Sequence, residues 1–575
     1  MIYKLFAIKF KGSILQRVAK CKPLVYWMIC AAVGISGCTG HSVEDYKNEA
    51  DRKVYNIIDQ KWQKDFGSQV NYKISDTPAS PNAIQIEKAV PPSGVLTLPR
   101  AVALATAHNR LYQLEKEILY ISALDLVLAR HEFEPRFFGK ATGGYAKAGG
   151  KDLVGLGTGF DADQAIQEAT EPKFDPDRLL EEPTGTGIGF DQLLASGAII
   201  STEIAIGWGR ILAGDTAGEA LASILRATVT QPLLRGSRRR VVMENLTQTE
   251  RNTLYQLRTF NRFRKTFVVS IISQYYWVLQ KFDAVRNAEN NYNTLQWLYE
   301  RVEKLTNAGR LPPFELDRVG QEKLLARDRC LQAQKEYEQA LDEFKIAVSL
   351  PTESQFQLDA NELEALRAAK MTSPNFSEAD ALDTALSLRL DLSNSVDAIE
   401  DAHRKVLVTA DAFGAELNLV ARVYAPSQDV TSDAKYFTDW VQTLLELDLP
   451  LDRVAEQNVY RKALITLNQQ HRQYEEAIDM VVLEVRQAYR DLTESAQRYR
   501  VQSESLELAS ERFEKTFLLL QYGRVNTRRV LNALDDLLDA QNAATQALVD
   551  YTVATLNFYR DTGVLQVRPD GTWEL

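Results

Sequence analysis

Apolar residues recur at alternating steps of three and four along residues 451 to 563, with one interruption at Gln521-Tyr522-Gly523-Arg524. Before the interruption the row contains Val482, Val485, Tyr489, Leu492, Ala496, Tyr499, Ser503, Leu506, Ser510, Phe513, Phe517 and Leu520. After it the row contains Val530, Leu534, Leu537, Gln541, Ala544, Leu548, Tyr551, Thr555 and Phe558. A seven-residue repeat on both sides of a glycine-containing break predicts two long helices, folded into an antiparallel coiled-coil hairpin with its tip near Gly523.

The second arm of this hairpin carries an additional row of residues, one position away from the first. The row contains Leu531, Leu538, Thr545, Thr552 and Tyr559. A two-helix hairpin needs only one seam, so the second row predicts neighbours on both sides, as in a wall of helices. One arm of a larger solid bundle is the alternative.

Other long segments with helical periodicity lie between short segments in which apolar and polar residues alternate. Helices are predicted over 42–64, from about 236 to 306, from 314 to 350, and as single helices over 97–134 (with Thr97 as N-cap) and 377–411. Extended segments are predicted over 136–146, 197–209, 226–234, 413–423 and 443–451. Their alternation of apolar and polar residues is typical of membrane β-barrel strands, although half-buried soluble sheets share it.

If these segments form a membrane barrel that the chain enters and leaves on the same side, the number of crossings must be even. The first half of the chain has three strand-like segments and the second half has two. We therefore assign 136–146 and 226–234 to the barrel and 197–209 to a hairpin outside it.

Two glycine-rich stretches, 155–159 and 185–189, have the spacing of a nucleotide-binding loop. No strand-to-helix context surrounds them, and eight acidic residues lie between the two copies. A long, turn-rich surface loop is the better interpretation.

The N-terminal segment predicts export and lipidation. A basic stretch precedes an apolar run over 24–35 that is too short for a comfortable membrane span. Ile35-Ser36-Gly37-Cys38 resembles the bacterial lipoprotein box, which implies lipidation of Cys38, and Thr39 is compatible with transfer to the outer membrane. An uncleaved anchor and an ordinary secretory leader are the alternatives.

Charge and cysteine usage narrow the class of protein. The leader contains six cations and no acidic residue, so its removal changes the formal charge from −10 to −16. This balance argues against a nucleic-acid partner. Three of the four cysteines lie in or directly after the leader, and Cys330 is the only one in the rest of the sequence. The sequence therefore predicts neither a disulfide framework nor a metal site.

The order of helix, strands, long helix, Gly-Arg turn and helix occurs twice. Gln231-Pro232-Leu233 corresponds to Leu449-Pro450-Leu451, and Gly309-Arg310-Leu311 corresponds to Gly523-Arg524-Val525. We expect a signal peptide (1–37), a lipidated helix and linker (38–95), a first repeat (96–350), an inter-repeat linker (351–375), a second repeat (376–565) and a tail (566–575).

Residues 96–565 resemble the TolC family of outer-membrane efflux proteins. The resemblance rests on Leu96 to Ala101, Gln231 to Gly236, Tyr276-Trp277, both Gly-Arg turns, Leu534 to Gln541, and Tyr551 to Asn557. It implies a mainly α-helical homotrimer with a membrane β-barrel. Each subunit supplies four strands to a shared twelve-stranded barrel and long helices to a periplasmic α-helical barrel. Four strands cannot close a barrel alone, and open strand edges are not tolerated in lipid.

The resemblance also implies a function and candidate site residues. The protein is expected to be the outer-membrane exit duct of a tripartite efflux or type I secretion system. It would be coupled to an inner-membrane RND or ABC-type pump through a periplasmic adaptor. The expected docking tips are Gly309, Arg310, Leu311, Gly523, Arg524 and Val525. Glycine permits the tight turn, and arginine can donate to carbonyl groups of a partner.

The expected periplasmic constriction departs from the family. Alignment from Gly523 onward places Arg529 and Asn532 where a well-known family member has aspartates. Three converging copies of Arg529 would repel one another or gather anions, so an acidic ring at this level cannot be assumed. Asp535 and Asp536, one turn further on, could form a displaced ring.

Two other function classes remain as alternatives. A lipid-anchored coiled-coil structural or adaptor protein without a pore would explain the helices but not the alternating strands. An enzyme is disfavoured, because His41, His108, His131, His403 and His471 form no triad or metal spacing. No cofactor is expected.

Overall fold

The computed structural model describes residues 42–67, 71–75, 94–140, 143–148, 151–156, 187–211, 219–368, 377–426, 440–449, 451–568 and 573–574. The chain divides into two compact units, Met1–Asp59 and Gln60–Leu575. Helix α3 (Val43–Phe66) contains the boundary between them and confirms the first predicted helix. All other described elements belong to the second unit.

Apart from the short α8, the main helices of the second unit occur in two series with the same order. The first series is α5 (Leu98–His108), α6 (Arg110–His131), α8 (Arg239–Val242), α9 (Glu244–Asn307) and α10 (Pro313–Ala347). The second is α12 (Glu378–Leu388), α13 (Leu390–Asp411), α14 (Val454–Gln521) and α15 (Thr527–Asp561). Corresponding helices match closely in length: α5 and α12 have 11 residues each, α6 and α13 have 22, and α10 and α15 have 35.

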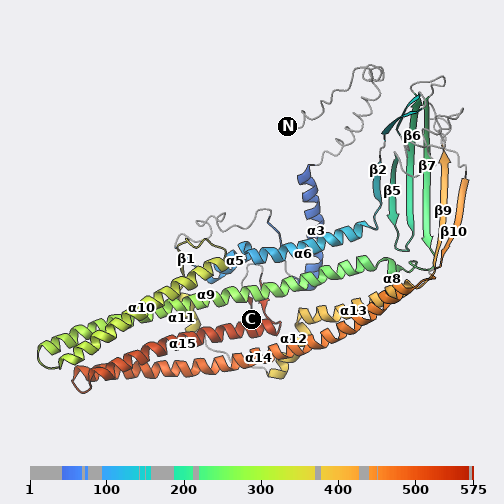
Figure 1. Cartoon of the computed structure of the whole chain (residues 1–575). Helices are drawn as coiled ribbons and strands as arrows, with labels where there is room; N and C mark the ends of the chain where they lie inside the picture. The colour runs from blue at the N-terminus through green and yellow to red at the C-terminus, as the bar shows by residue number, and fades with distance from the viewer. Residues whose placement is uncertain are drawn as a thin grey trace, which may run out of the picture. The chain divides into compact units, whose positions relative to one another are not determined.

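The predicted coiled-coil hairpin is present as α14 and α15, and α9 and α10 form a second hairpin. Helix α15 packs against α14 and also against α9, which confirms the prediction of two flanking neighbours (Figure 1). Val530 and Leu534 of the first row are buried, and so are Leu531 and Leu538 of the second. The neighbouring hairpins therefore pack along both rows of α15.

The expectation of single helices over 97–134 and 377–411 is wrong, because each is broken once. The break at Asn109 starts a new helix, since its side chain accepts hydrogen bonds from the backbone N–H groups of Leu111 and Tyr112. The second break falls at Arg389, which has an extended backbone. Thr97 occupies the N-cap position of α5 but its side chain makes no capping hydrogen bond.

Among the described residues, one antiparallel sheet contains eight strands. They are β2 (Arg136–Lys140), β3 (Gly143–Ala148), β4 (Lys151–Leu156), β5 (Gly187–Leu193), β6 (Ile199–Ile211), β7 (Glu219–Pro232), β9 (Glu416–Pro426) and β10 (Trp440–Asp448). The main path is β10-β9-β7-β6-β4-β3. Figure 1 shows β6, β7, β9 and β10 side by side. Strand β6 pairs with β5 along its first half and with β4 near its end, while β2 pairs with β5 and β3 pairs with β4.

Residues 197–209, expected to form a hairpin outside the barrel, instead contribute strand β6 to the same sheet as the strands expected in the barrel. Strand β6 pairs with β7 from Ile199 to Arg210, over nearly its whole length. Strands β4 and β5 also occupy part of the region expected to be a surface loop, and Gly155, Gly187 and Gly189 are strand residues. Residues 157–186 of that loop lie outside the described residues. Within the part that is described, the sheet is six strands wide rather than the four expected for one subunit.

The expected linker at 351–375 contains regular structure. Strand β8 (Gln357–Leu358) pairs in parallel with β1 (Val95–Leu96), and α11 (Asn361–Ala368) follows. Near the C-terminus, β11 (Gln566–Val567) pairs with β12 (Trp573–Glu574). None of the helices in the described residues is both long and apolar enough to cross a membrane.

Candidate functional site

The two helical hairpins turn in the same way. Gly309 has a φ of +69° and Gly523 a φ of +66°, a backbone conformation that favours glycine. The N–H of Arg310 bonds to the carbonyl of Leu305 at 2.8 Å, and the N–H of Arg524 bonds to that of Leu519 at 3.0 Å. Both turns are therefore Schellman motifs, in which the glycine ends the helix and satisfies its last carbonyl groups.

A shared apolar cluster brings the two turns together at one end of the helices. Leu311 and Val525 are half-buried and pack against the cluster formed by Leu295, Leu298, Val302, Val319, Ala326, Val530, Leu531 and Leu534. Gly309, Arg310 and Gly523 are exposed, as is Arg524. The structure thus brings the six predicted tip residues to one region, with both arginines at the surface.

The residues expected at the constriction lie in the first turns of α15. Arg529 and Asn532 are exposed. Asp535 accepts a hydrogen bond from Arg329 of α10 at 2.8 Å, which raises the pKa of Arg329. Asp536 accepts a hydrogen bond from Arg512 of α14 at 2.5 Å. The two carboxylates therefore tie α15 to α10 on one side and to α14 on the other.

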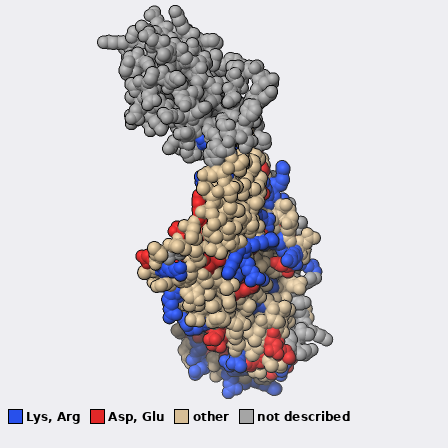
Figure 2. Space-filling model, turned by 90° about the vertical axis from the view of Figure 1, so that its right-hand side faces the viewer, with Lys and Arg blue, Asp and Glu red and all other residues tan. Residues whose placement is uncertain are grey.

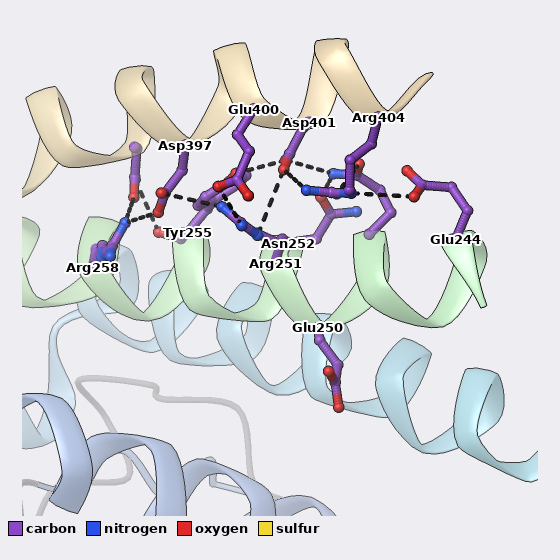
Figure 3. Close-up of polar contacts among 12 residues, drawn as sticks. Glu244, Glu250, Arg251, Asn252, Tyr255, Arg258, Asp397, Glu400, Asp401 and Arg404 are labelled. Atoms are coloured by element: carbon purple, nitrogen blue, oxygen red, sulfur yellow. Dashed lines mark hydrogen bonds and ion pairs between the residues drawn. The ribbon is translucent and has the colours of Figure 1, made fainter. Parts of the chain in front are cut away.

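A ladder of charged side chains joins α9 to α13, as Figure 3 shows. Asp401 is buried and accepts hydrogen bonds from Tyr255 at 2.6 Å and Arg404 at 2.8 Å. Arg251 forms ion pairs with Asp397 at 3.1 Å and Glu400 at 2.6 Å. Because α9 and α13 belong to different halves of the chain, the ladder binds the two halves together close to where both enter the sheet.

Burial has consequences for two groups of this ladder, the phenol of Tyr255 and the carboxylate of Glu244. Burial raises the pKa of Tyr255, and its hydrogen bond to Asp401 raises it further, so this phenol stays protonated. Glu244 is also buried; its Oε2 accepts from Arg404 at 3.1 Å, whereas its Oε1 has no hydrogen-bond partner. The charged groups of the ladder pair with one another across the contact between α9 and α13, and we interpret the ladder as structural.

A second buried cluster connects α9, α11 and α15. Arg367 donates to Asp283 at 2.8 Å and to Thr545 at 2.9 Å, and the hydroxyl of Thr545 donates to the same carboxylate at 2.7 Å. Asp283 and Thr545 are buried. The segment between the two halves is therefore anchored in the helical body by a charge-assisted network.

Lys116 of α6 is buried, and its ammonium lies 5.1 Å from the centre of the Tyr112 ring. Burial lowers the pKa of Lys116 to about 8. Burial likewise lowers the pKa of Lys265 to about 8, although its ammonium donates to the carbonyl of Gly563 at 2.9 Å. In both cases burial disfavours the charged form of the lysine.

Sequence reasoning missed these networks. Asp397 and Asp401 are four residues apart on one helix face, as are Arg251 and Tyr255, which signals a polar face. The partner of such a face is set by tertiary packing. In the described ranges, no three His, Cys, Asp or Glu side chains lie close enough to hold a metal ion. Cys38, the predicted lipidation site, lies outside the described residues.

Comparisons with known proteins identify the fold. No family model matches the sequence, and no curated protein matches it. The solved structure of the channel-forming protein CusC shares 14% identity, with a TM-score of 0.55 over 86% of this chain and 100% of that chain. The outer membrane channel CmeC of Campylobacter jejuni shares 14% identity, with a TM-score of 0.56 over 81% of this chain and 85% of that chain.

The open state of the outer membrane channel MtrE from Neisseria gonorrhoeae gives a similar result. It shares 13% identity, with a TM-score of 0.54 over 86% of this chain and 97% of that chain. The chain thus has the fold of these outer membrane channels. At the level of the fold, the expected resemblance to TolC-type channels is confirmed.

Proposed function

We propose that this chain, which has the fold of the TolC-type outer membrane channels, is an outer-membrane exit duct that works as a homotrimer. In this proposal the duct is passive, and an inner-membrane RND or ABC-type pump drives export through a periplasmic adaptor. The observation that carries the proposal is the combination of a sheet that has one apolar face with helical hairpins that end in two matched turns.

The faces of the sheet support insertion in lipid. Directly paired residues of an antiparallel sheet lie on the same face. Leu445 pairs with Leu419, and both are exposed; Val441 and Leu447, also exposed, lie on the same face. Figure 2 shows that charged side chains of the described residues gather on the helical part, whereas few lie on the surface just below the grey atoms.

The edges of the sheet support a shared barrel. Among the described residues, β10 pairs only with β9, and β2 and β3 pair only with β5 and β4. Unpaired backbone groups at such edges are costly in lipid, so the edges need partners. Other copies of the chain supply these partners most simply, because the two edges can pair in a ring.

The similar order and lengths of the two helix series support an internal duplication, with repeats at 96–350 and 376–565. In a trimer, α9, α10, α14 and α15 of each subunit would form the wall of a periplasmic tunnel. The row of residues on α14 from Val482 to Leu520 is mostly half-buried. This burial is compatible with the arrangement, because a wall helix has a face for each neighbour.

The two tip turns are proposed as the docking site of the adaptor. Gly309, Arg310 and Leu311 of one hairpin and Gly523, Arg524 and Val525 of the other would face the adaptor's own helical hairpin. The exposed arginines can donate to carbonyl groups at the end of a partner helix. In the same proposal, Cys38 is lipidated after removal of residues 1–37 and anchors the chain to the outer membrane.

The constriction is proposed to lie in the first turns of α15. Arg529 and Asn532 would face the tunnel, while Asp535 and Asp536 are occupied by Arg329 and Arg512 of the same subunit. Loss of the Arg329–Asp535 pair would release α15 from the neighbouring hairpin, and loss of the Arg512–Asp536 pair would release it from α14. The alternative function, a coiled-coil adaptor without a pore, leaves the apolar face of the sheet unexplained.

A pair of substitutions on β10 tests the proposal. Leu445→Arg places a charge on the apolar face, where it costs about 2–4 kcal/mol at the bilayer midplane. Gln442→Arg places the same charge on the opposite face. We expect Leu445→Arg to reduce the amount of trimer in isolated outer membranes, and Gln442→Arg to leave it near the wild-type amount. Equal amounts of trimer for both variants, or monomeric wild-type protein, would contradict the proposal.

A further inference from the structure

The sheet contains a hairpin, β5–β6, that differs from strands β2, β7, β9 and β10. Each of those four strands is adjacent to a helix in the chain. Strand β2 follows α6, β7 leads into α8, β9 follows α13, and β10 leads into α14. Strands β5 and β6 instead connect to each other through the turn at residues 194–198, in which the N–H of Leu194 bonds to the carbonyl of Ala198 at 2.8 Å. The hairpin therefore adds strands to the sheet without adding helices.

The turn of this hairpin is packed tightly between two junctions of strand and helix. Gln192 donates to the carbonyl of Phe133, at the end of α6, at 3.3 Å. Ser196 and Gln231 of β7 hydrogen-bond to each other. Gly197 has a φ of +82°, and a Cβ there would lie 2.5 Å from the carbonyl oxygen of Gly236. The hairpin is thus fitted into the base of the sheet.

The hairpin continues both faces of the sheet. One row of laterally paired residues crosses all six strand positions with largely apolar side chains: Phe137, Phe190, Thr202, Ala227, Val423 and Val441. The next row crosses the same positions with polar side chains: Arg136, Asp191, Ser201, Thr228, Arg422 and Gln442. Asp191 accepts from Ser201 at 2.6 Å within the polar row.

This continuity matters because a hairpin outside a barrel would have no reason to match the barrel's two faces. An apolar row that faces lipid and a polar row that faces a lumen are what barrel strands require. All pairs in the sheet are antiparallel, so the edge strands β10 and β2 run in opposite directions. The β10 edge of one copy can therefore pair antiparallel with the β2 edge of the next.

We infer that the β5–β6 hairpin is part of the barrel wall, so that each subunit supplies six strands and a trimer closes a barrel of eighteen. This inference rests on the proposed trimeric channel. Barrel diameter grows roughly linearly with strand number, so this barrel is about 1.5 times as wide as one of twelve strands. A wider barrel admits bulkier cargo through the outer-membrane part of the duct.

Cysteine accessibility tests the inference in the full-length trimer. All variants are made in a Cys330→Ala background, which removes the buried thiol of Cys330. Cys38 is present in every variant and therefore contributes equally to all of them. The hairpin pair is Glu203→Cys and Ile204→Cys, and the control pair on β7 is Thr228→Cys and Val229→Cys. Trimers in lipid bilayers are treated with a charged, membrane-impermeant maleimide. We expect Glu203→Cys and Thr228→Cys, on the face of the polar row, to be labelled. Ile204→Cys and Val229→Cys, on the face of the apolar row, should remain unlabelled.

The two pairs separate failure of the inference from failure of the proposed channel. Labelling of both hairpin variants, with alternation kept in the β7 pair, would place the hairpin outside the wall and overturn the inference alone. Loss of alternation in the β7 pair would overturn the proposed barrel and the inference with it. Electron microscopy of the same trimer in nanodiscs is the second measurement: eighteen strands are expected, and twelve would overturn the inference.

Discussion

Arg329 of α10 donates a hydrogen bond to Asp535 of α15 at 2.8 Å, across the contact between the two helical hairpins. Arg512 of α14 pairs with Asp536, the next residue of α15. Neighbouring aspartates thus hold α15 on both sides, near the turns that end the helices. Both ion pairs are partly exposed, so each contributes little to global stability and can be broken at small cost.

We predict that Arg329→Ala increases the open-state conductance of the proposed channel. The substitution removes a tether between hairpins and should change the free energy of unfolding by less than about 1 kcal/mol. Arg498→Ala is the matched control, because it breaks the Arg498–Asp550 pair between α14 and α15. Single-channel recording of both variants checks the prediction, and an equal increase in both would show that the Asp535 tether has no special role.

Substitution of glycine by alanine should have opposite effects on stability at Gly523 and at Gly320. Gly523→Ala places a side chain at a φ of +66° and should destabilise the protein by about 1 kcal/mol. Gly320→Ala lies within α10, where a Cβ would be 3.4 Å from the Tyr299 ring, and should stabilise the helix by about 0.5–1 kcal/mol. Thermal unfolding followed by circular dichroism gives both signs. A neutral Gly523→Ala would argue against a strict need for glycine at the tip.

Lys116→Met should stabilise the protein at pH 7 and reduce the dependence of its stability on pH. Burial lowers the pKa of Lys116 from 10.5 to about 8, so the folded state binds fewer protons than the unfolded state between these values. Wild-type stability therefore rises as the pH increases from about 8 toward 10.5. Replacement by an apolar side chain should gain on the order of 3 kcal/mol below pH 8.

Denaturant unfolding at a series of pH values checks this prediction. Lys265 has a similarly lowered pKa, so part of the slope above pH 8 should persist in Lys116→Met and disappear when Lys265 is also replaced. An unchanged slope in the double variant would mean that neither lysine is neutralised by burial.

Asp401 and Glu400 are adjacent but should differ strongly in importance. Asp401 is buried and accepts hydrogen bonds from Tyr255, Gln248 and Arg404, so Asp401→Leu leaves these donors without their acceptor. We expect a loss of about 3 kcal/mol or more in the free energy of unfolding. Glu400 is 61% exposed, and Glu400→Gln should cost less than about 1 kcal/mol. Equal losses, measured by denaturant unfolding, would contradict the ladder's proposed role in joining the two halves.

The sequence predicted the helical hairpins well because their signal is local and long. A seven-residue repeat specifies both the helix and the face that it buries, and the glycine at each break specifies the turn. The second row on α15, from Leu531 to Leu538, even predicted the presence of a second neighbour. The breaks at Asn109 and Arg389 were missed, because a capping asparagine and an arginine give weak signals inside an otherwise continuous apolar pattern.

The sheet and the charge networks depend on information that one sequence does not display. Period-two alternation identified β6 as extended, but only its pairing with β7 shows that it lies inside the sheet. Strand β5 was hidden because Gly187 and Gly189 suggested a loop. The network of Asp283, Arg367 and Thr545 joins three helices, and no spacing along the chain predicts which charged faces meet.

The most direct test of the central claim is the conductance of the purified full-length protein in planar lipid bilayers, recorded for wild type and for Arg329→Ala combined with Arg512→Ala. The proposed channel predicts discrete conductance steps from trimeric protein, with larger steps when both tethers of α15 are removed. Trimeric protein that inserts into the bilayer but gives no steps in either form would contradict the claim that this chain forms an exit duct.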